Sequence, residues 1–437
     1  MNIDYKKYFE DNKEIILKQI QELIAIPSVI NEQPEVIEAP FGKENVEALE
    51  YMLNLGKEYG FKTYNCENVC GHIEYGDGDE VFAVLCHTDV VPAIGLWTKP
   101  PFESYIKDGK IYGRGSIDDK GPAIIAFHAL NILKENNIKV NKKIRLIIGT
   151  DEETGSRGVK RYIKKVGMPN MGISPDADFP IIYGEKGICT IDIIDEAKCN
   201  IKAIGGTRYN IVAPSLEFSI ENEEFTSKYV YNLENNKYYV EGESAHAMEP
   251  NNGVNAIKKF AELVKEYTDS KLIKFINENL IDTRLKDMSL DITDKEMGDL
   301  TMNMGLLEMG DISKLGINIR YPHNLDFEKF YESFSDKAKK YGLKCVLGSN
   351  SKPHYVDPKS EFVQKLYSTY KKFTNDLSPM KTIGGGTYAR ELKLGVAFGV
   401  LFPKEKEMAH QTDEFANIEN LFKAGEIIAD AIYNICK

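Results

Sequence analysis

Apolar runs that end abruptly in polar residues are the main pattern along this chain. Residues 81–86 (VFAVLC) are rich in β-branched and aromatic side chains and lead into the polar sequence HTD at 87–89. Residues 143–149 (KIRLIIG) lead in the same way into TDEE at 150–153. Buried strands have this texture, and open α/β sheets bind ligands just beyond the carboxyl ends of their strands. The pattern therefore predicts two buried strands that each deliver polar side chains to such an edge.

The spacing of apolar residues divides the rest of the chain into predicted helices and predicted strands. Apolar residues at helical spacing predict helices at 15–24, 46–59, 122–135, 256–267, 327–340, 361–373 and 418–435. Short apolar or alternating runs predict further strands at 61–65, 72–75, 110–112, 183–195, 216–220, 300–307, 316–321 and 396–402. Strands alternate with helices near both ends of the chain, whereas antiparallel-looking strands dominate the middle.

This organisation predicts an α/β protein with a discontinuous catalytic domain. We expect the first segment at residues 1–186 and the second at 352–437, sharing a mixed, mostly parallel sheet that is covered by helices. Residues 187–351 then form an inserted α+β domain. A length of 437 residues agrees with two domains, because single cores rarely grow that large.

Composition and charge limit the kinds of molecule that this protein is expected to bind. The chain has 55 Lys and Arg against 67 Asp and Glu, a net charge of −12, so a nucleic-acid partner is not expected. No stretch reaches the ~18 consecutive apolar residues of a membrane span, and the first 20 residues lack a secretion signal. Seven scattered cysteines fit free thiols in a reducing compartment. We therefore expect a cytoplasmic protein without a membrane partner.

Histidines and carboxylates recur in clusters after apolar segments. The clusters lie at 87–89, 118–119, 151–153, 176–178 and His410. Each cluster alone is more often a solvated turn than a site. Together, imidazole and carboxylate groups without thiolates suit zinc, manganese or cobalt. A pair of such ions needs a bridging carboxylate, and one further carboxylate must stay off the metals to accept a proton.

Six segments resemble, in order, the di-metal amidohydrolases of the aminoacylase/carboxypeptidase/dipeptidase family. They read LCHTDVVP, YGRGSIDDKGP, GTDEETGSRG, ISPDADFPIIYGEKG, GGGTYAR and MAHQTDEF. The similarity covers nearly the whole chain and is closest to the bacterial Xaa-His dipeptidase branch (PepV-type, carnosinase-like). This resemblance implies two divalent metal ions per chain, zinc first, with manganese or cobalt as alternatives.

The resemblance also implies a role for each matching residue. Its five metal ligands are His87 and Asp176 on one ion, Glu153 and His410 on the other, and Asp118 bridging both. Glu152 takes the role of general base, and Asp89 orients the imidazole of His87. A cis peptide bond is implied between Asp118 and Asp119. Asp178 falls where the family tolerates other residues, so it is left out of the ligand set.

In the inserted domain, the same likeness implies substrate contacts. His246 matches a lid histidine that polarises the scissile carbonyl, and Asn210 and Arg320 match residues that contact the substrate carboxylate or oxyanion. Local sequence alone favours a surface-loop histidine at 246, and Arg320 could equally pair with an acid. Gly385 lies in the triple-glycine run, where a substrate backbone could approach closely. That run lacks the lysine of a phosphate-binding loop.

The implied reaction is hydrolysis of dipeptides with a free N-terminus by a hydroxide that bridges the metals, with Glu152 as base. A free amine needs a nearby acid, for which Asp119 or a lid carboxylate is a candidate. The inserted segment is long enough for two ferredoxin-like lid halves that supply His246 in cis, so we expect a monomer. The alternatives are an N-acyl amino acid deacylase or desuccinylase of the same family, and a non-catalytic metal- or peptide-binding protein.

Overall fold

The protein consists of two compact units in the computed structural model, which describes residues 3–437 except 33–35, 222–224, 228–229 and 234–236. Unit 1 comprises Met1–Tyr183, Val356–Lys381 and Gly386–Lys437. Unit 2 comprises Gly184–Tyr355 and Thr382–Gly385. The short piece 382–385 therefore lies in unit 2, although its sequence neighbours on both sides lie in unit 1.

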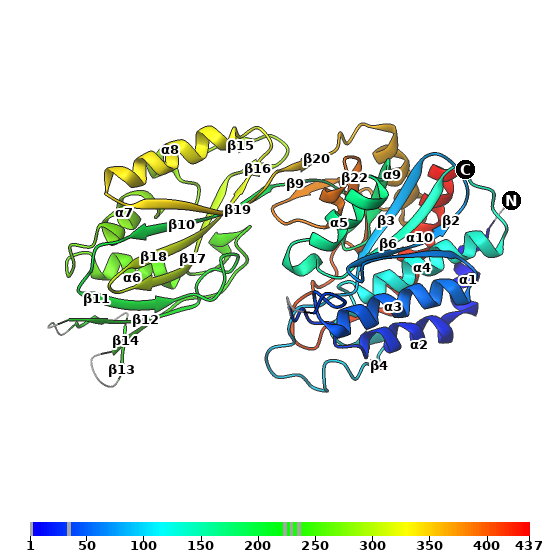
Figure 1. Cartoon of the computed structure of the whole chain (residues 1–437), viewed down its shortest axis with the longest axis horizontal. Helices are drawn as coiled ribbons and strands as arrows, with labels where there is room; N and C mark the ends of the chain where they lie inside the picture. Colours follow the sequence, from blue (N-terminus) through cyan, green and yellow to red (C-terminus); the bar gives the residue numbers. More distant parts are fainter. Residues whose placement is uncertain (1–2, 33–35, 222–224, 228–229, 234–236) are drawn as a thin grey trace. The chain divides into compact units, whose positions relative to one another are not determined.

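Unit 1 contains most of a mixed sheet whose central strands run parallel (Figure 1). The order is β1-β2-β6-β3-β7-β22-β9-β20, and β21 pairs with β9. The bounds are β1 (Lys62–Cys66), β2 (Cys70–Tyr75), β3 (Val81–His87), β6 (Lys143–Gly149), β7 (Met171–Ser174), β9 (Ile182–Glu185), β20 (His354–Tyr355), β21 (Lys381–Ile383) and β22 (Gly395–Ala397). β6, β3, β7 and β22 are parallel neighbours. The predicted α/β fold class is confirmed.

Helices cover both faces of this sheet. They are α1 (Tyr5–Asp11), α2 (Lys13–Ile24), α3 (Lys43–Glu58), α4 (Lys120–Glu135), α5 (Arg157–Val166), α9 (Glu361–Thr374) and α10 (Ile418–Cys436). Phe82, Val84 and Cys86 of β3 pack into the core that contains α4 and α10, whereas Ala83 and Leu85 pack with residues of α5. Because both faces are buried, the strand reads as an unbroken apolar run.

The strand predicted at 396–402 is wrong as a single element. It is divided into β22 and β23 (Val400–Leu401), and β23 leaves the main sheet to pair with β8 (Ala177–Asp178). Gly399 lies between them with φ of +86°, and a Cβ at this position would lie 2.4 Å from the ring of Phe179. A glycine that turns the chain here thus redirects an apolar run that otherwise reads as one strand.

Unit 2 is one antiparallel sheet with helices packed on it. The strand order is β13-β14-β12-β11-β17-β18-β10-β19. The bounds are β10 (Gly187–Asp195), β11 (Ile201–Gly205), β12 (Ser215–Ile220), β13 (Tyr231–Leu233), β14 (Lys237–Glu241), β17 (Thr301–Met309), β18 (Ser313–Tyr321) and β19 (Lys344–Ser351). The helices are α6 (Ala256–Val264), α7 (Lys271–Asn279) and α8 (Phe327–Lys340). Their apolar faces share one core with β10 and β18.

The helix α7 is absent from the sequence prediction, although its signals are present. Ser270 caps it by accepting from the backbone N–H of Ile273, and Leu272, Phe275 and Ile276 are buried at helical spacing. Its nine residues are short for a helix to be recognised by periodicity alone.

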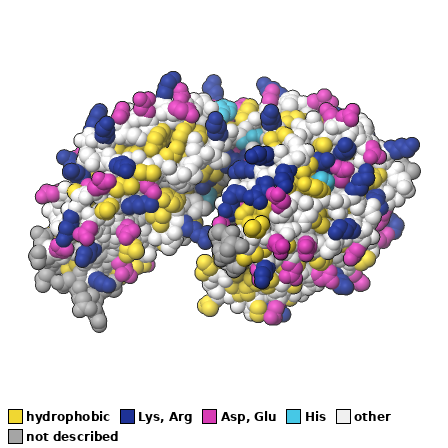
Figure 2. All heavy atoms as spheres, in the orientation of Figure 1, with side chains coloured by type: hydrophobic (Ala, Val, Ile, Leu, Met, Phe, Trp, Pro, Cys, Tyr) yellow, Lys and Arg dark blue, Asp and Glu magenta, His cyan; other side chains and the backbone are white. Residues whose placement is uncertain are grey.

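Smaller elements complete the description. They are β4 (Tyr105–Lys107), β5 (Lys110–Tyr112) and β24 (Phe415–Asn417) in a three-stranded sheet, and β15 (Thr293–Asp294) with β16 (Gly298–Asp299) as a pair. Across the described residues, every helix is too short or too polar to span a bilayer. On the face drawn in Figure 2, acidic side chains lie among the lysines and arginines.

Candidate metal centre

Three neighbouring parallel strands of unit 1 end at one edge, and each is followed by candidate ligands. His87 is the last residue of β3, and it pairs in register with Gly149, the last residue of β6. Glu152 and Glu153 lie in the 3-10 turn that follows β6, and Asp176 follows β7 by two residues. These side chains therefore meet beyond the carboxyl ends of the strands, where open α/β sheets place ligands.

Two loops bring the remaining candidates to the same place. Asp118 lies two residues before the first residue of the buried helix α4, and its peptide bond to the N-cap residue Asp119 is cis, as the resemblance implies. His410 lies in the segment before β24, almost 300 residues further along the chain. The structure thus gathers all five predicted ligands in unit 1.

The donor atoms form two groups that share Asp118. His87 Nε2 lies 3.1 Å from Asp118 Oδ1 and 3.5 Å from Asp176 Oδ2. His410 Nε2 lies 3.1 Å from Asp118 Oδ2 and 3.0 Å from Glu153 Oε1. Each oxygen of Asp118 therefore faces a different imidazole, which is the arrangement that a bridging carboxylate needs. Glu152 lies with His87 and Asp176, with ligand atoms within 4.8 Å of one another.

The contacts of the two ring nitrogens of His87 are those expected of a metal ligand. Its Nε2 is buried, and no described residue forms a hydrogen bond with it in good geometry. Its Nδ1 lies 2.9 Å from the backbone carbonyl oxygen of Asp89, to which it donates. The carbonyl can only accept, so Nδ1 carries a proton, and Nε2 is the nitrogen that faces the two carboxylates. A divalent cation would satisfy both the nitrogen and the oxygens.

The carboxylates and imidazoles strongly shift one another's pKa. Burial, together with the nearby Asp118, raises the pKa of Asp176 to about 6. Burial alone would lower the pKa of His410, but hydrogen bonds and charge from Asp118 and Glu153 raise it to about 11. Protons therefore hold the place that cations would take, and metal binding here has to displace them.

Asp89 has more partners than the resemblance implies. Its carboxylate lies 3.4 Å from His87 Nδ1, and its two oxygens accept the backbone N–H groups of Glu152 and Glu153, each at 3.1 Å. One buried side chain thus fixes the 3-10 turn that carries both glutamates, in addition to facing the histidine.

The residues predicted to contact substrate lie together in unit 2. His246 forms a bridge with Ile211, and the N–H of Ala247 donates to the carbonyl of Asn210 at 2.9 Å. Asn303, beside Asn318 in the sheet, donates to the carbonyls of residues 209 and 211. Arg320 donates to Asn318 Oδ1 at 2.7 Å and to the carbonyl of Gly384, next to Gly385, at 2.9 Å.

The contacts of His246 also set its tautomer. Its Nδ1 accepts the N–H of Met248 at 3.3 Å, so in the neutral ring Nε2 carries the proton and can donate to an oxygen. Arg320 is almost fully buried, so its guanidinium is held in one orientation by its partners.

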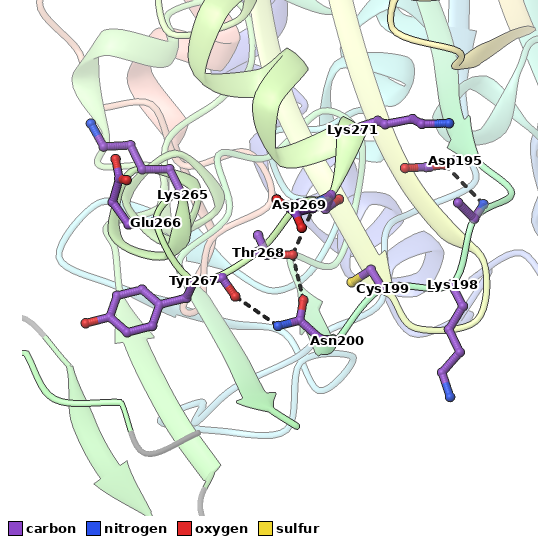
Figure 3. A pocket seen from close by; sticks show the side chains of 12 residues that line it. Asp195, Lys198, Cys199, Asn200, Lys265, Glu266, Tyr267, Thr268, Asp269 and Lys271 are labelled. Carbon is purple, nitrogen blue, oxygen red and sulfur yellow. Dashed lines mark hydrogen bonds between the residues drawn. The ribbon is translucent and has the colours of Figure 1, made fainter. Parts of the chain in front are cut away.

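A polar hollow lies elsewhere in unit 2, away from the predicted metal ligands and substrate contacts. Figure 3 shows this polar pocket of about 670 Å³ beside the start of α7. Asn200, which lines it, is already paired, donating to the carbonyl of Tyr267 at 2.9 Å and accepting from the Thr268 hydroxyl at 2.7 Å. A cavity of about 60 Å³ borders Asp118 and Asp176 at the metal centre itself.

Comparison with known proteins identifies the chain. Peptidase family M20/M25/M40 matches residues 83–434, which is most of its length. The chain belongs to this peptidase family. It is therefore a hydrolase that acts on peptide bonds.

Relatives agree with this membership over the full length. A protein of Staphylococcus aureus (strain MW2), provisionally named a dipeptidase, is 37% identical over 465 residues, covering 99% of each chain. Human carnosine dipeptidase 1 has a similar fold, with a TM-score of 0.64, 14% identity and coverage of 98% and 97%. A Bacillus subtilis M20 peptidase described as dinuclear metal binding gives a TM-score of 0.57 at 11% identity, with coverage of 98% and 99%.

Two residues of the peptidase's centre have roles that the sequence did not predict. Asp119, suggested as an acid for a substrate amine, is fully buried and accepts the backbone N–H of His87 at 3.0 Å. That suggestion is wrong, because Asp119 supports a ligand and cannot reach a substrate. Glu414, which the sequence reasoning omits, accepts N–H groups of the loop that carries Asp118. Its position in the MAHQTDEF segment was the only available signal.

Proposed function

We propose that the peptidase hydrolyses the peptide bond of dipeptides with a free N-terminus, using two divalent cations held at this centre. The observation that supports the proposal is the pair of donor groups that share Asp118, each with one imidazole. Nitrogen and carboxylate donors without sulfur fit zinc first, and manganese or cobalt also. The cations supply an activated water and polarise the scissile carbonyl.

In this proposal, His87, Asp176 and Asp118 hold one ion, and His410, Glu153 and Asp118 hold the other. Each ion then has three protein donors without Glu152. Glu152 is thus left to take a proton from the attacking water and to return it to the leaving amine. The backbone N–H of Glu152 donates to Asp89, which fixes the backbone of Glu152. The carboxylate of Glu152 lies beside His87 and Asp176.

Unit 2 supplies the contacts that recognise the substrate. We assign the Nε2 proton of His246 to the scissile carbonyl oxygen, where a hydrogen bond stabilises the charge that develops. The fork of Arg320 suits the substrate's terminal carboxylate, with Asn210 close by. Gly385 leaves room for the substrate backbone, since it has no side chain. The proposal requires unit 2 to act on substrate bound at the centre in unit 1.

A panel of dipeptides, free and N-acetylated, tests this function. Metal-stripped protein is assayed after addition of zinc or manganese, beside Glu152→Gln and the matched control Asp178→Asn. We expect hydrolysis of the free dipeptides only. We also expect a loss of about 10²–10⁴-fold in kcat for Glu152→Gln, the range for a general base. Asp178 pairs with Lys381 and is no ligand in this assignment, so its variant keeps activity within a few-fold.

Each other outcome has a defined meaning. Hydrolysis of the acetylated substrates alone would move the protein to a deacylase or desuccinylase activity of the same family. Metal binding without hydrolysis in either series would indicate a protein that binds metal or peptide without catalysis. A Glu152→Gln variant as active as the unaltered protein would remove Glu152 from the role of base.

A further inference from the structure

Glu414 is a buried carboxylate beside the metal centre that the proposed reaction does not use. It lies four residues after His410 and directly before β24, and it has no exposed surface. Its Oε2 accepts from Arg114 Nη1 at 2.5 Å. Its Oε1 accepts the backbone N–H groups of Gly115, Ile117 and Asp118 at 3.0, 3.0 and 3.3 Å. The last of these belongs to the bridging residue itself.

All of these partners are donors. A carboxylate can accept from every one of them, because it offers only lone pairs. The contacts occupy both oxygens, so Glu414 supports the loop and does not coordinate an ion. The loop is also held by backbone, since the N–H of Gly113 donates to the carbonyl of Glu414 at 3.0 Å. Residues 113–118 are therefore wrapped around one side chain from the far end of the sequence.

The same region is tied to a third segment. The neighbouring Asp413 accepts the backbone N–H and the hydroxyl of Thr98, each at 2.8 Å. The guanidinium of Arg114 lies over the ring of Trp97, 5.1 Å from its centroid. Trp97 is the only tryptophan in the chain, so its fluorescence reports on this network.

We propose that Glu414 is the positioning residue of the dinuclear centre, holding the bridging Asp118 in register with His410. These two ligands come from segments almost 300 residues apart, yet Asp118 Oδ2 and His410 Nε2 lie 3.1 Å from each other. Glu414 belongs to the segment of His410 and bonds the backbone of Asp118, so it sets the spacing between them. The inference rests on the proposed function only in taking Asp118 and His410 as metal ligands.

The test uses Glu414→Gln in the full-length protein. The amide NH₂ of glutamine would face either Arg114 or the three backbone N–H groups. Because the NH₂ group can only donate, it cannot accept a hydrogen bond from these donors, and the contacts of one oxygen are lost. Metal-stripped protein is titrated calorimetrically with zinc and with manganese. We expect metal affinity to fall about 10–100-fold, the usual effect of removing a partner that orients a metal ligand. We also expect a shifted Trp97 emission, and kcat that recovers at excess metal with KM nearly unchanged.

Two further variants make the result decisive. Glu405→Gln is the matched control, because Glu405 lies in the same segment and accepts the N–H of Phe402, at a distance from the loop of Asp118 in sequence. We expect its metal affinity to stay within threefold of the unaltered protein. Glu414→Asp keeps the charge on a shorter side chain, and we expect an intermediate loss of affinity. Thermal melting of the metal-free proteins establishes that each variant is folded.

The proposal fails if Glu414→Gln and Glu414→Asp fold and bind both metals with unaltered affinity. It also fails if neither variant folds, since Glu414 would then serve general stability and not the centre. The titration needs no substrate, so it separates this inference from the proposed function. If metal affinity depends on Glu414 but the unaltered protein hydrolyses no dipeptide, the inference about Glu414 is sustained and the proposed function is overturned.

Discussion

His128 allows a quantitative prediction about stability, because it is a buried histidine that belongs to neither group of candidate metal ligands. It lies within α4 and is 1% exposed. Its Nε2 lies 2.7 Å from Gln19 Oε1, which can only accept, so Nε2 carries a proton. Its Nδ1 accepts from Tyr8 Oη at 2.9 Å, and Asn131 donates to that hydroxyl at 2.8 Å. The network is complete for a neutral imidazole.

Burial lowers the pKa of His128 from 6.5 to about 3. In the unfolded chain the same group takes up its proton near pH 6.5. Between these values the unfolded state binds one more proton than the native state, so stability falls as the pH falls. The slope is about 1.4 kcal/mol per pH unit, which amounts to about 2 kcal/mol between pH 7 and pH 5.

The assay is urea unfolding of metal-free protein at pH 7 and pH 5, followed by the fluorescence of Trp97 in unit 1. Other titrating groups are common to all variants, so the comparison isolates His128. We expect His128→Gln to reduce the difference in unfolding free energy between the two pH values by about 2 kcal/mol.

The control is Gln19→Met, which removes a partner of the imidazole and leaves it buried. It should lower stability at both pH values and preserve the difference between them. A His128→Gln variant that keeps the full pH difference would refute the reasoning, because the native imidazole would then not be held neutral.

Two further predictions concern the metal centre and the assembly. Asp89→Asn places an amide NH₂ against the backbone N–H of Glu152 or Glu153. We therefore expect metal affinity, measured by calorimetric titration, to fall about 10–100-fold. The metal affinity of the control Asp178→Asn should stay within threefold of the unaltered protein. Equal affinities for the two variants would contradict the role of Asp89. Because we propose that unit 2 provides His246 to the site of its own chain, light scattering should give one species of 49.4 kDa at all concentrations, and a stable dimer would count against this.

Many of the helices and strands, and the sheet edge at which the chemistry lies, can be predicted from the sequence. Helix α8 was predicted at 327–340, where the structure has it, because its apolar residues recur at helical spacing and face one core. The run 81–86 predicted β3 and placed His87 at its end, because a strand buried on both faces has to be apolar until it leaves the sheet. The family motifs added the residues that no periodicity marks, and the five predicted ligands lie together.

The way in which distant segments meet is visible in the folded chain and in no local pattern. Asp118 and His410 face each other, and residues 382–385 lie in unit 2, because of the path of the chain and not because of any local pattern. The partners of Glu414 and Asp89 are mostly backbone N–H groups. Every residue except proline carries such a donor, so no residue type in the sequence indicates which N–H groups will bind these carboxylates. The contacts that position this centre therefore become visible only when the chain is folded.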